Sequence, residues 1–190
     1  MSTKLHEEDP DINLQLYPFQ SKYFNFNSHK IHYIDEGSGE PVVLVHGNPT
    51  WSFYYRSTIK TLSPFCRVIA PDHVGMGLSD KPISGYSWTL KQRVADFAAF
   101  IDHLELKEKI TLVVHDWGGA IAFSWAVENP DRVKRIIVLN SAAFTMPATK
   151  RFPLPLYAAR FPILGYIFMR YFNVFAHSAI YFGAKKKATR

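Results

Sequence analysis

Short apolar runs alternate with stretches of helical periodicity through the first 140 residues of the chain. Four runs are mainly apolar along their whole length, as expected of strands that are buried on both faces of a sheet. They cover residues 42–45, 67–70, 110–114 and 136–139. Residues 20–26 and 30–36 instead alternate polar and apolar side chains, which predicts a hairpin near a sheet edge.

Two helices are predicted between these strands. The first has apolar positions at helical spacing, namely Leu90, Val94, Phe97, Ile101 and Leu104. Thr89 and Gln92 stand three positions apart at its start, as in a capping box. The second helix covers about 118–129, and Pro130 ends it. Because strands and helices alternate, the pattern predicts a mostly parallel α/β sheet.

The pattern changes after Ala143, where four prolines interrupt it and helices packed outside the sheet are expected. Residues 141–190 contain eight of the 22 Lys and Arg residues and no Asp or Glu. A basic segment can bind nucleic acid or an anionic membrane. No nucleic-acid recognition motif is present, so we expect no nucleic-acid partner. Arg160, Arg170 and His177 interrupt the apolar residues, which excludes a membrane span and leaves only weak membrane association open.

The overall composition is that of a globular domain. The chain has 190 residues, of which 47% are hydrophobic, enough to form a buried core. The single cysteine, Cys66, excludes a disulfide framework and fits a reducing compartment. The polar, acidic start of the chain lacks the apolar centre of a signal peptide. We therefore expect a cytoplasmic protein.

The strongest chemical motif is at residues 112–119, where a buried strand runs into a helix through a tight turn. This is the context of a nucleophile elbow, and Asp116 occupies the position of the usual serine. Gly118 and Gly119 provide the small residues that the turn needs. A carboxylate nucleophile displaces a leaving group from saturated carbon and forms an ester. The substrate would carry a halide, an epoxide oxygen or a strained lactone oxygen. The alternative is that Asp116 merely caps the following helix.

A second motif, His-Gly-Asn-Pro-Thr-Trp at 46–51, follows the strand at 42–45. In this type of elbow, one oxyanion-binding amide comes from such a loop and the other from the residue after the nucleophile. Asn48 and Trp117 occupy these positions, and both side chains are also hydrogen-bond donors. We expect them to bind the leaving anion, although Asn-Pro also fits a plain turn. Trp51 is interpreted as a packing residue.

Four other polar residues near these motifs are interpreted as structural. Asp72 and His73 lie in a turn-rich loop, residues 70–81, where local hydrogen bonds would hold them. His46 and His115 flank the proposed site at fixed positions of the two motifs, and we interpret them as scaffold residues.

Three motifs resemble the haloalkane dehalogenases: residues 46–51, the Gly-Met-Gly-Leu-Ser-Asp-Lys-Pro stretch at 75–82, and His-Asp-Trp-Gly-Gly at 115–119. Residues 139–144 and 152–175 are more similar to the β-lactone decarboxylases of bacterial olefin biosynthesis. The resemblance implies an α/β-hydrolase fold, with residues 1–145 as the N-terminal part of the core and 146–190 as the beginning of a helical cap. It implies Asp116 as nucleophile, Asn48 and Trp117 as binders of the leaving anion, and no cofactor or metal.

The chain departs from the triad of this fold, which runs nucleophile, acid, histidine. The only histidine after Asp116 is His177, which lies in the cap-like segment, and Asn140 and Ser141 stand where some relatives have the acid. The general base and its acid are therefore expected to be missing, and the sheet to lack its last strands. The strand at 136–139 would then form an exposed apolar edge, which favours aggregation.

The leading functional hypothesis is decarboxylation of cis-3,4-dialkyl β-lactones to cis-alkenes. The resemblance implies a long-chain hydrophobic substrate and, as partners, other enzymes of olefin biosynthesis. The first alternative is a haloalkane dehalogenase. An epoxide hydrolase, with Tyr157 or Tyr166 as the cap acid, fits less well because those enzymes usually carry an aromatic residue at the position of Asn48. An inactive, truncated fragment is the alternative from outside the enzymes.

Overall fold

The computed structural model describes residue 13 and residues 15–141, 164–174 and 177. The chain divides into two compact units, Met1–Ala143 and Phe144–Arg190, which we describe separately. The predicted boundary between residues 145 and 146 lies outside the described residues. The assignment of the two parts as core and cap remains a prediction.

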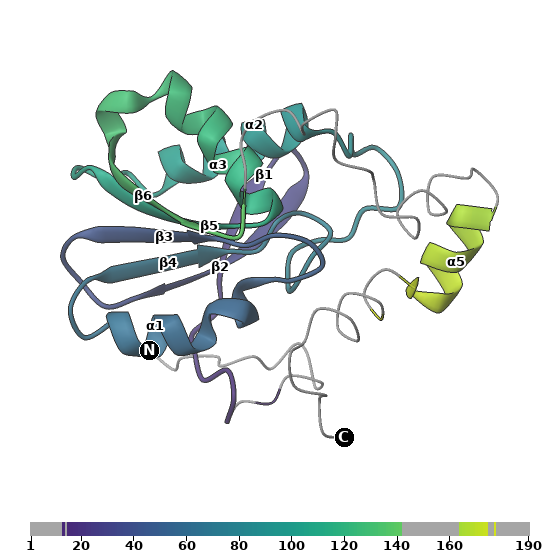
Figure 1. Cartoon of the computed structure of the whole chain (residues 1–190), viewed down its shortest axis with the longest axis horizontal. Helices are drawn as coiled ribbons and strands as arrows, with labels where there is room; N and C mark the ends of the chain where they lie inside the picture. Colours follow the sequence, from purple (N-terminus) through teal and green to yellow (C-terminus); the bar gives the residue numbers. More distant parts are fainter. Residues whose placement is uncertain (1–12, 14, 142–163, 175–176, 178–190) are drawn as a thin grey trace. The chain divides into compact units, whose positions relative to one another are not determined.

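The first unit is built on a six-stranded sheet with the order β1-β2-β4-β3-β5-β6 (Figure 1). The strands are β1 (Lys22–Phe26), β2 (His29–Glu36), β3 (Pro41–Val45), β4 (Arg67–Pro71), β5 (Ile110–His115) and β6 (Val133–Leu139). Strands β4, β3, β5 and β6 run parallel, and β2 is antiparallel to both β1 and β4. The predicted hairpin and the mostly parallel α/β sheet are confirmed.

The central strands are buried on both faces because alternate side chains enter two separate cores. All five residues of β3 are buried. Val43 and Val45 pack into one core, whereas Val42 and Leu44 pack into the other. A strand that faces two cores needs apolar side chains at every position, which explains the continuous apolar runs of the sequence.

Helices cover the two faces of this sheet (Figure 1). The helices α2 (Leu90–His103) and α3 (Trp117–Glu128) contribute to the first core, where the rings of Phe97 and Trp125 meet edge to face. The opposite core is closed by α1 (Arg56–Leu62) and by the 3₁₀ turn η1 (Ser52–Tyr55) before it. The sequence pattern predicted α2 and α3 but missed α1. A second 3₁₀ turn, η2 (Pro130–Arg132), follows α3.

The predicted capping box at the start of α2 is half correct. The Thr89 hydroxyl accepts a hydrogen bond from the Gln92 backbone N–H at 3.2 Å. The Gln92 side chain does not bond to the Thr89 backbone N–H, as a capping box would require. Its amide instead donates a hydrogen bond to the Asp96 carboxylate at 2.8 Å. Gln92 therefore orients Asp96 on the helix instead of completing the box.

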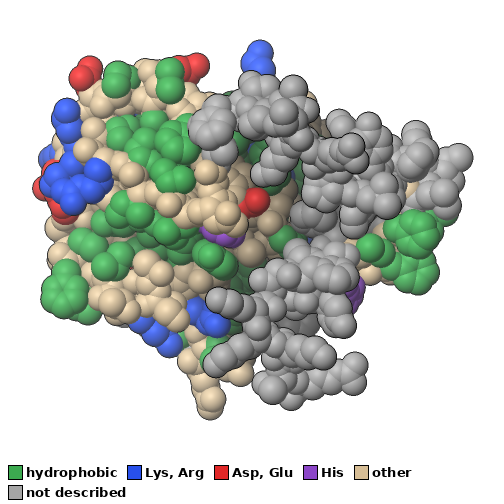
Figure 2. Space-filling view, viewed as in Figure 1, with side chains coloured by type: hydrophobic (Ala, Val, Ile, Leu, Met, Phe, Trp, Pro, Cys, Tyr) green, Lys and Arg blue, Asp and Glu red, His purple; other side chains and the backbone are tan. Residues whose placement is uncertain are grey.

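Strand β6 forms an edge of the sheet, since among the described residues it pairs only with β5. Ile137, Val138 and Leu139 on this strand are 39–47% exposed. Figure 2 shows hydrophobic side chains reaching the molecular surface in several patches. The predicted exposed apolar edge is confirmed for the described part of the chain.

The described part of the second unit is helical. Its main element, α5 (Leu164–Phe172), exposes Ile167, Phe168 and Tyr171. The rings of Phe168 and Phe172 contact each other, with centroids 6.1 Å apart. Among the described residues, no helix has the length and apolar character that a membrane crossing would require.

Candidate active site

Asp116 lies at the junction of β5 and α3 in a backbone conformation that is rare for any residue with a side chain. Its φ and ψ angles are 49° and −126°. Such a conformation costs of order 1–3 kcal/mol and persists only where the surrounding structure enforces it. The Asp116 side chain makes no capping hydrogen bond to α3. The alternative that Asp116 is only a helix cap is therefore wrong.

The Asp116 side chain points to the loop after β3. The backbone N–H of Asn48 donates a hydrogen bond to Asp116 Oδ2 at 2.9 Å. The Asp116 carbonyl accepts hydrogen bonds from the Ser141 hydroxyl at 2.6 Å and from the Gly119 N–H at 3.0 Å. The two motifs that the sequence singled out are thus in direct contact, although they lie 68 residues apart.

Close packing around the elbow depends on glycines. A Cβ atom on Gly118 would lie 2.2 Å from the Val45 carbonyl oxygen, and one on Gly119 would lie 1.8 Å from the Ser141 hydroxyl oxygen. The predicted need for small residues after Asp116 is confirmed. Gly47, whose role the sequence did not reveal, would bring a Cβ to 2.5 Å from Asp116 Oδ2. The Asp116 carboxylate therefore occupies space that a side chain at position 47 would fill.

Asn48 and Trp117 line one pocket of about 370 Å³ beside the elbow. Its wall also includes His73, Gly75, Met76, Trp88, Thr89, Leu90, Arg93 and Ile121. Apart from Arg93, the side chains added by α2 and the preceding segment are mostly apolar. These lining residues were missed because the sequence signal of Leu90 and its neighbours is that of an ordinary amphipathic helix.

His46 and His73 form a buried, neutral pair that joins two loops. The His73 backbone N–H donates to His46 Nε2, and the His73 ring donates from Nε2 to the His46 carbonyl, both at 3.0 Å. The His46 ring also bonds to the Gly47 carbonyl through Nδ1. Burial lowers the pKa of His46 and holds the pKa of His73 well below its ordinary value. This geometry supports a scaffold role for both residues.

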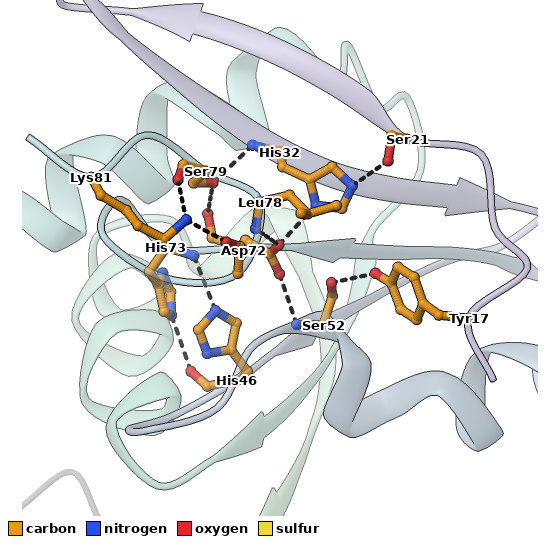
Figure 3. Close-up of polar contacts among 11 residues, drawn as sticks. Tyr17, Ser21, His32, His46, Ser52, Asp72, His73, Leu78, Ser79 and Lys81 are labelled. Atoms are coloured by element: carbon orange, nitrogen blue, oxygen red, sulfur yellow. Dashed lines mark hydrogen bonds and ion pairs between the residues drawn. The ribbon is translucent and has the colours of Figure 1, made fainter. Parts of the chain in front are cut away.

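Asp72 is the centre of a buried polar network (Figure 3). Its carboxylate accepts hydrogen bonds from the Ser52 N–H at 2.7 Å, His32 Nδ1 at 2.8 Å and the Leu78 N–H at 2.9 Å. Burial by itself raises the pKa of Asp72, but the hydrogen bond and charge of His32, with other contacts, hold the pKa below its ordinary value. The carboxylate fastens three segments together, as expected of a structural residue.

Among the described residues, the other histidines do not form a base beside Asp116. The His32–Asp72 pair, which the sequence did not reveal, is fully buried, and the second ring nitrogen of His32 bonds to Ser21. His115 stacks on Tyr54, and its buried Nδ1 has no hydrogen-bond partner within the described part of the chain. His177 is exposed in the second unit. Among the described residues, no cluster of His, Cys, Asp or Glu could hold a metal ion.

Asp116 lies in a strained turn between a parallel strand and a helix, and its carboxylate accepts a hydrogen bond from the loop after the neighbouring strand. These features define an α/β protein of the hydrolase type with a carboxylate at its elbow. The sequence profile of the alpha/beta hydrolase fold matches residues 40–164, and the chain belongs to this family.

Known proteins similar to the chain carry two kinds of name. A cis-3-alkyl-4-alkyloxetan-2-one decarboxylase of Shewanella oneidensis is 51% identical over 90% of this chain and 54% of its own length. A decarboxylase of the same name from Xanthomonas campestris is 43% identical over 82% and 54%. The haloalkane dehalogenase DatA from Agrobacterium tumefaciens C58 is 31% identical with a TM-score of 0.76, over 83% of this chain and 54% of its own. The chain thus spans about half the length of these relatives.

Proposed function

We propose that the protein is an enzyme in which Asp116 is the nucleophile and Asn48 and Trp117 bind the leaving anion. The observation that carries this proposal is the 2.9 Å hydrogen bond from the Asn48 N–H to the Asp116 carboxylate, at an elbow whose strained backbone presents that side chain. The hydrogen bond stabilises the ionised form of Asp116 that attack requires. The pocket that Asn48 and Trp117 line supports binding of the substrate beside the elbow, since Trp117 directly follows Asp116.

The proposed substrates are cis-3,4-dialkyl β-lactones, which the enzyme converts to cis-alkenes. An Asp116 oxygen bonds to the saturated ring carbon that carries the ring oxygen. The bond between this carbon and the ring oxygen breaks, which gives a carboxylate. The carboxylate then leaves as carbon dioxide, its C–C electron pair forms the alkene, and the ester bond to Asp116 breaks. No water and no cofactor are consumed. Support comes from the two relatives whose names specify an alkyloxetanone decarboxylase and from the apolar side chains of the pocket wall.

The proposal extends to the setting of the reaction. The proposed substrate is small and hydrophobic, with long alkyl chains, which suits the mostly apolar wall of the pocket beside the elbow. Other enzymes of olefin biosynthesis are the proposed partners, and the cytoplasm is the proposed location.

A haloalkane dehalogenase is the second candidate, favoured by the structural similarity to DatA. Here Asp116 displaces a halide, and water must then hydrolyse the ester with the help of a base. The epoxide hydrolase alternative has less support. Tyr157 and the side chain of Tyr166, its proposed acids, lie outside the described residues.

The test is incubation of the protein with a synthetic cis-3,4-dialkyl β-lactone and, separately, with a 1-haloalkane of matched chain length. Gas chromatography with mass spectrometry measures the alkene, and ion chromatography measures the halide. Alkene from the lactone without sustained halide release supports the decarboxylase. Halide release over many turnovers without alkene assigns the protein to the dehalogenases. If neither alkene nor halide forms, the proposed role of Asp116 is refuted.

A further inference from the structure

Arg93 places a guanidinium group on the wall of the pocket that Asn48 and Trp117 also line. Its Nη1 donates a hydrogen bond to the Val74 carbonyl at 2.5 Å. The guanidinium lies 5.4 Å from the centre of the Trp88 ring and 5.6 Å from that of Tyr86. These contacts fix the position of the cation and leave its remaining N–H groups free of other hydrogen bonds among the described residues.

The charge of Arg93 has no paired carboxylate in the described part of the chain. The nearest acid on the same helix, Asp96, makes no ion pair with it. The two Asp96 oxygens are occupied by the Tyr86 hydroxyl and the Gln92 amide. Burial lowers the pKa of Arg93, while Tyr86 and Asp96 partly offset that effect. A partly desolvated cation without a partner is costly, so an anion in the pocket would stabilise it.

The rest of the pocket wall favours an anion as well. Helix α2 begins at Leu90 and α3 at Trp117, and both of these residues line the pocket. Helix α2 is capped by Thr89 and has no acidic residue in its first turn, so the positive end of its dipole favours an anion in the pocket. The start of α3 carries the Asp116 carboxylate, whose charge is consumed when Asp116 attacks the substrate. His73, the other titratable residue of the wall, is buried and neutral. Arg93 is therefore the only fully charged side chain among the lining residues.

We propose that Arg93 is a specificity-determining residue that selects substrates releasing a carboxylate, as β-lactones do, over substrates releasing a halide. This inference rests on the proposed function. Ring opening consumes the charge of Asp116 and creates a carboxylate on the substrate, so negative charge moves into the pocket that Arg93 faces. The planar guanidinium fork matches the two oxygens of a carboxylate, whereas a spherical halide gains no such geometric match.

The size of the effect follows from simple electrostatics. At an effective dielectric constant of about 20, a charge roughly 8 Å away changes the binding constant of an anion by roughly 10- to 30-fold. A direct bidentate contact would add to this attraction. Removal of the Arg93 charge should therefore weaken carboxylate binding by at least about tenfold.

The experiment measures binding to the 190-residue chain by isothermal titration calorimetry, with octanoate, its neutral isostere octanamide, and bromide as probes. The wild-type chain should bind octanoate at least about tenfold more tightly than octanamide. Arg93→Met should abolish this preference and leave octanamide binding unchanged. Arg93→Lys keeps the charge but loses the fork, so it should weaken octanoate binding while bromide binding stays the same.

Arg132→Met is the matched control, because Arg132 also lies over a tryptophan ring, that of Trp125, but pairs with Asp102 outside the pocket. It should leave all three affinities unchanged. Equal octanoate affinity in wild type and Arg93→Met would overturn the proposal, and so would a parallel loss of octanoate and octanamide, which would indicate a purely structural role. Failure of the wild-type chain to prefer octanoate would also overturn it. Alkylation of Asp116 is measured separately by mass spectrometry. It tests the proposed function of Asp116 and does not depend on the role of Arg93.

Discussion

The backbone carbonyl of Asp116 accepts hydrogen bonds from the Ser141 hydroxyl and the Gly119 N–H, and these do not depend on its side chain. The side chain can therefore be changed with little cost to the fold. Asp116→Asn is nearly isosteric, and Asn tolerates positive φ angles well. The side chain does not cap α3, so no cap is lost. We expect the free energy of unfolding to change by less than about 1 kcal/mol. Formation of an alkyl ester should fall by several orders of magnitude because the amide is not a nucleophile.

Intact-mass spectrometry after incubation with a haloalkane measures ester formation by Asp116→Asn, and urea denaturation measures its stability. Deamidation back to aspartate is excluded by the mass of the unreacted protein. Undiminished alkylation of a verified asparagine variant would remove Asp116 as the nucleophile.

Gly47 packs directly against the Asp116 side chain. Its added Cβ would lie 2.4 Å from Asp116 Cβ and 2.5 Å from Oδ2, so Gly47→Ala must displace the Asp116 carboxylate. A displacement of about 1 Å at a reacting group can reduce the rate about 100-fold. We expect a loss of this order in the rate of Asp116 alkylation, measured by mass spectrometry.

Gly85→Ala is the control for the Gly47 substitution. Gly85 has a φ of 76° and open space around it, so the change adds backbone strain without a steric clash at the site. It should lower stability modestly and leave the alkylation rate near that of wild type. Equal alkylation rates for Gly47→Ala and wild type would show that the close contact at position 47 does not position the nucleophile.

At the scale of elements, the His46–His73 pair connects the loop after β3 to the loop after β4, and this connection depends on pH. Both folded-state pKa values lie below the ordinary value of 6.5 because the rings are buried. The stabilising effect is therefore fully present above about pH 6.5. It is lost as the pH falls below that value, because the unfolded chain takes up protons that the folded protein does not.

We expect the free energy of unfolding to decrease between pH 7.5 and 5.5, with a slope of at most about 1.4 kcal/mol per pH unit for each of the two histidines. His73→Gln removes the histidine whose pKa is held further below its ordinary value, so it should reduce the slope. Urea denaturation at several pH values measures the slope. His103→Gln, at an exposed position, is the control and should leave it unchanged. A slope unaffected by His73→Gln would contradict the role of the buried pair.

The first unit contains the proposed nucleophile and the hydrogen-bond donors proposed to bind the leaving anion. In the described residues, no histidine base lies next to them. Attack and hydrolysis should therefore separate in this 190-residue chain. We expect a haloalkane to leave a stable alkyl ester on Asp116, because its removal needs activated water. A β-lactone should turn over, because its decarboxylation needs no water.

Intact-mass spectrometry over time distinguishes these two behaviours: a persistent mass increase with the haloalkane, and unmodified protein plus alkene with the lactone. Asp116→Asn serves as the unreactive reference for both substrates. Repeated hydrolytic turnover of a haloalkane would reveal a base in the chain, with His177 as the first residue to replace.

Elements with local signals could be predicted from the amino-acid sequence. The continuous apolar runs predicted the buried strands because both faces of β3 and β5 enter apolar cores. The elbow could also be predicted, since a strand, a helix and the residues between them are contiguous around Asp116. Asn48 was identified because its loop directly follows a strand, which fixes the end of the sheet where it lies.

Contacts between residues that are distant in the chain could not be predicted, because they arise from the packing of the elements. Arg93 appears in the sequence as a polar position on an amphipathic helix, and it becomes a pocket cation only because α2 packs beside α3 on the same face of the sheet. Gly47 and Ser141 likewise gain their roles through close approach to Asp116. Asp72 could be predicted as structural, but its partners His32 and Ser52 lie 40 and 20 residues away. Periodicity records which face of its own element a residue occupies, whereas contacts between elements depend on how those elements pack in three dimensions.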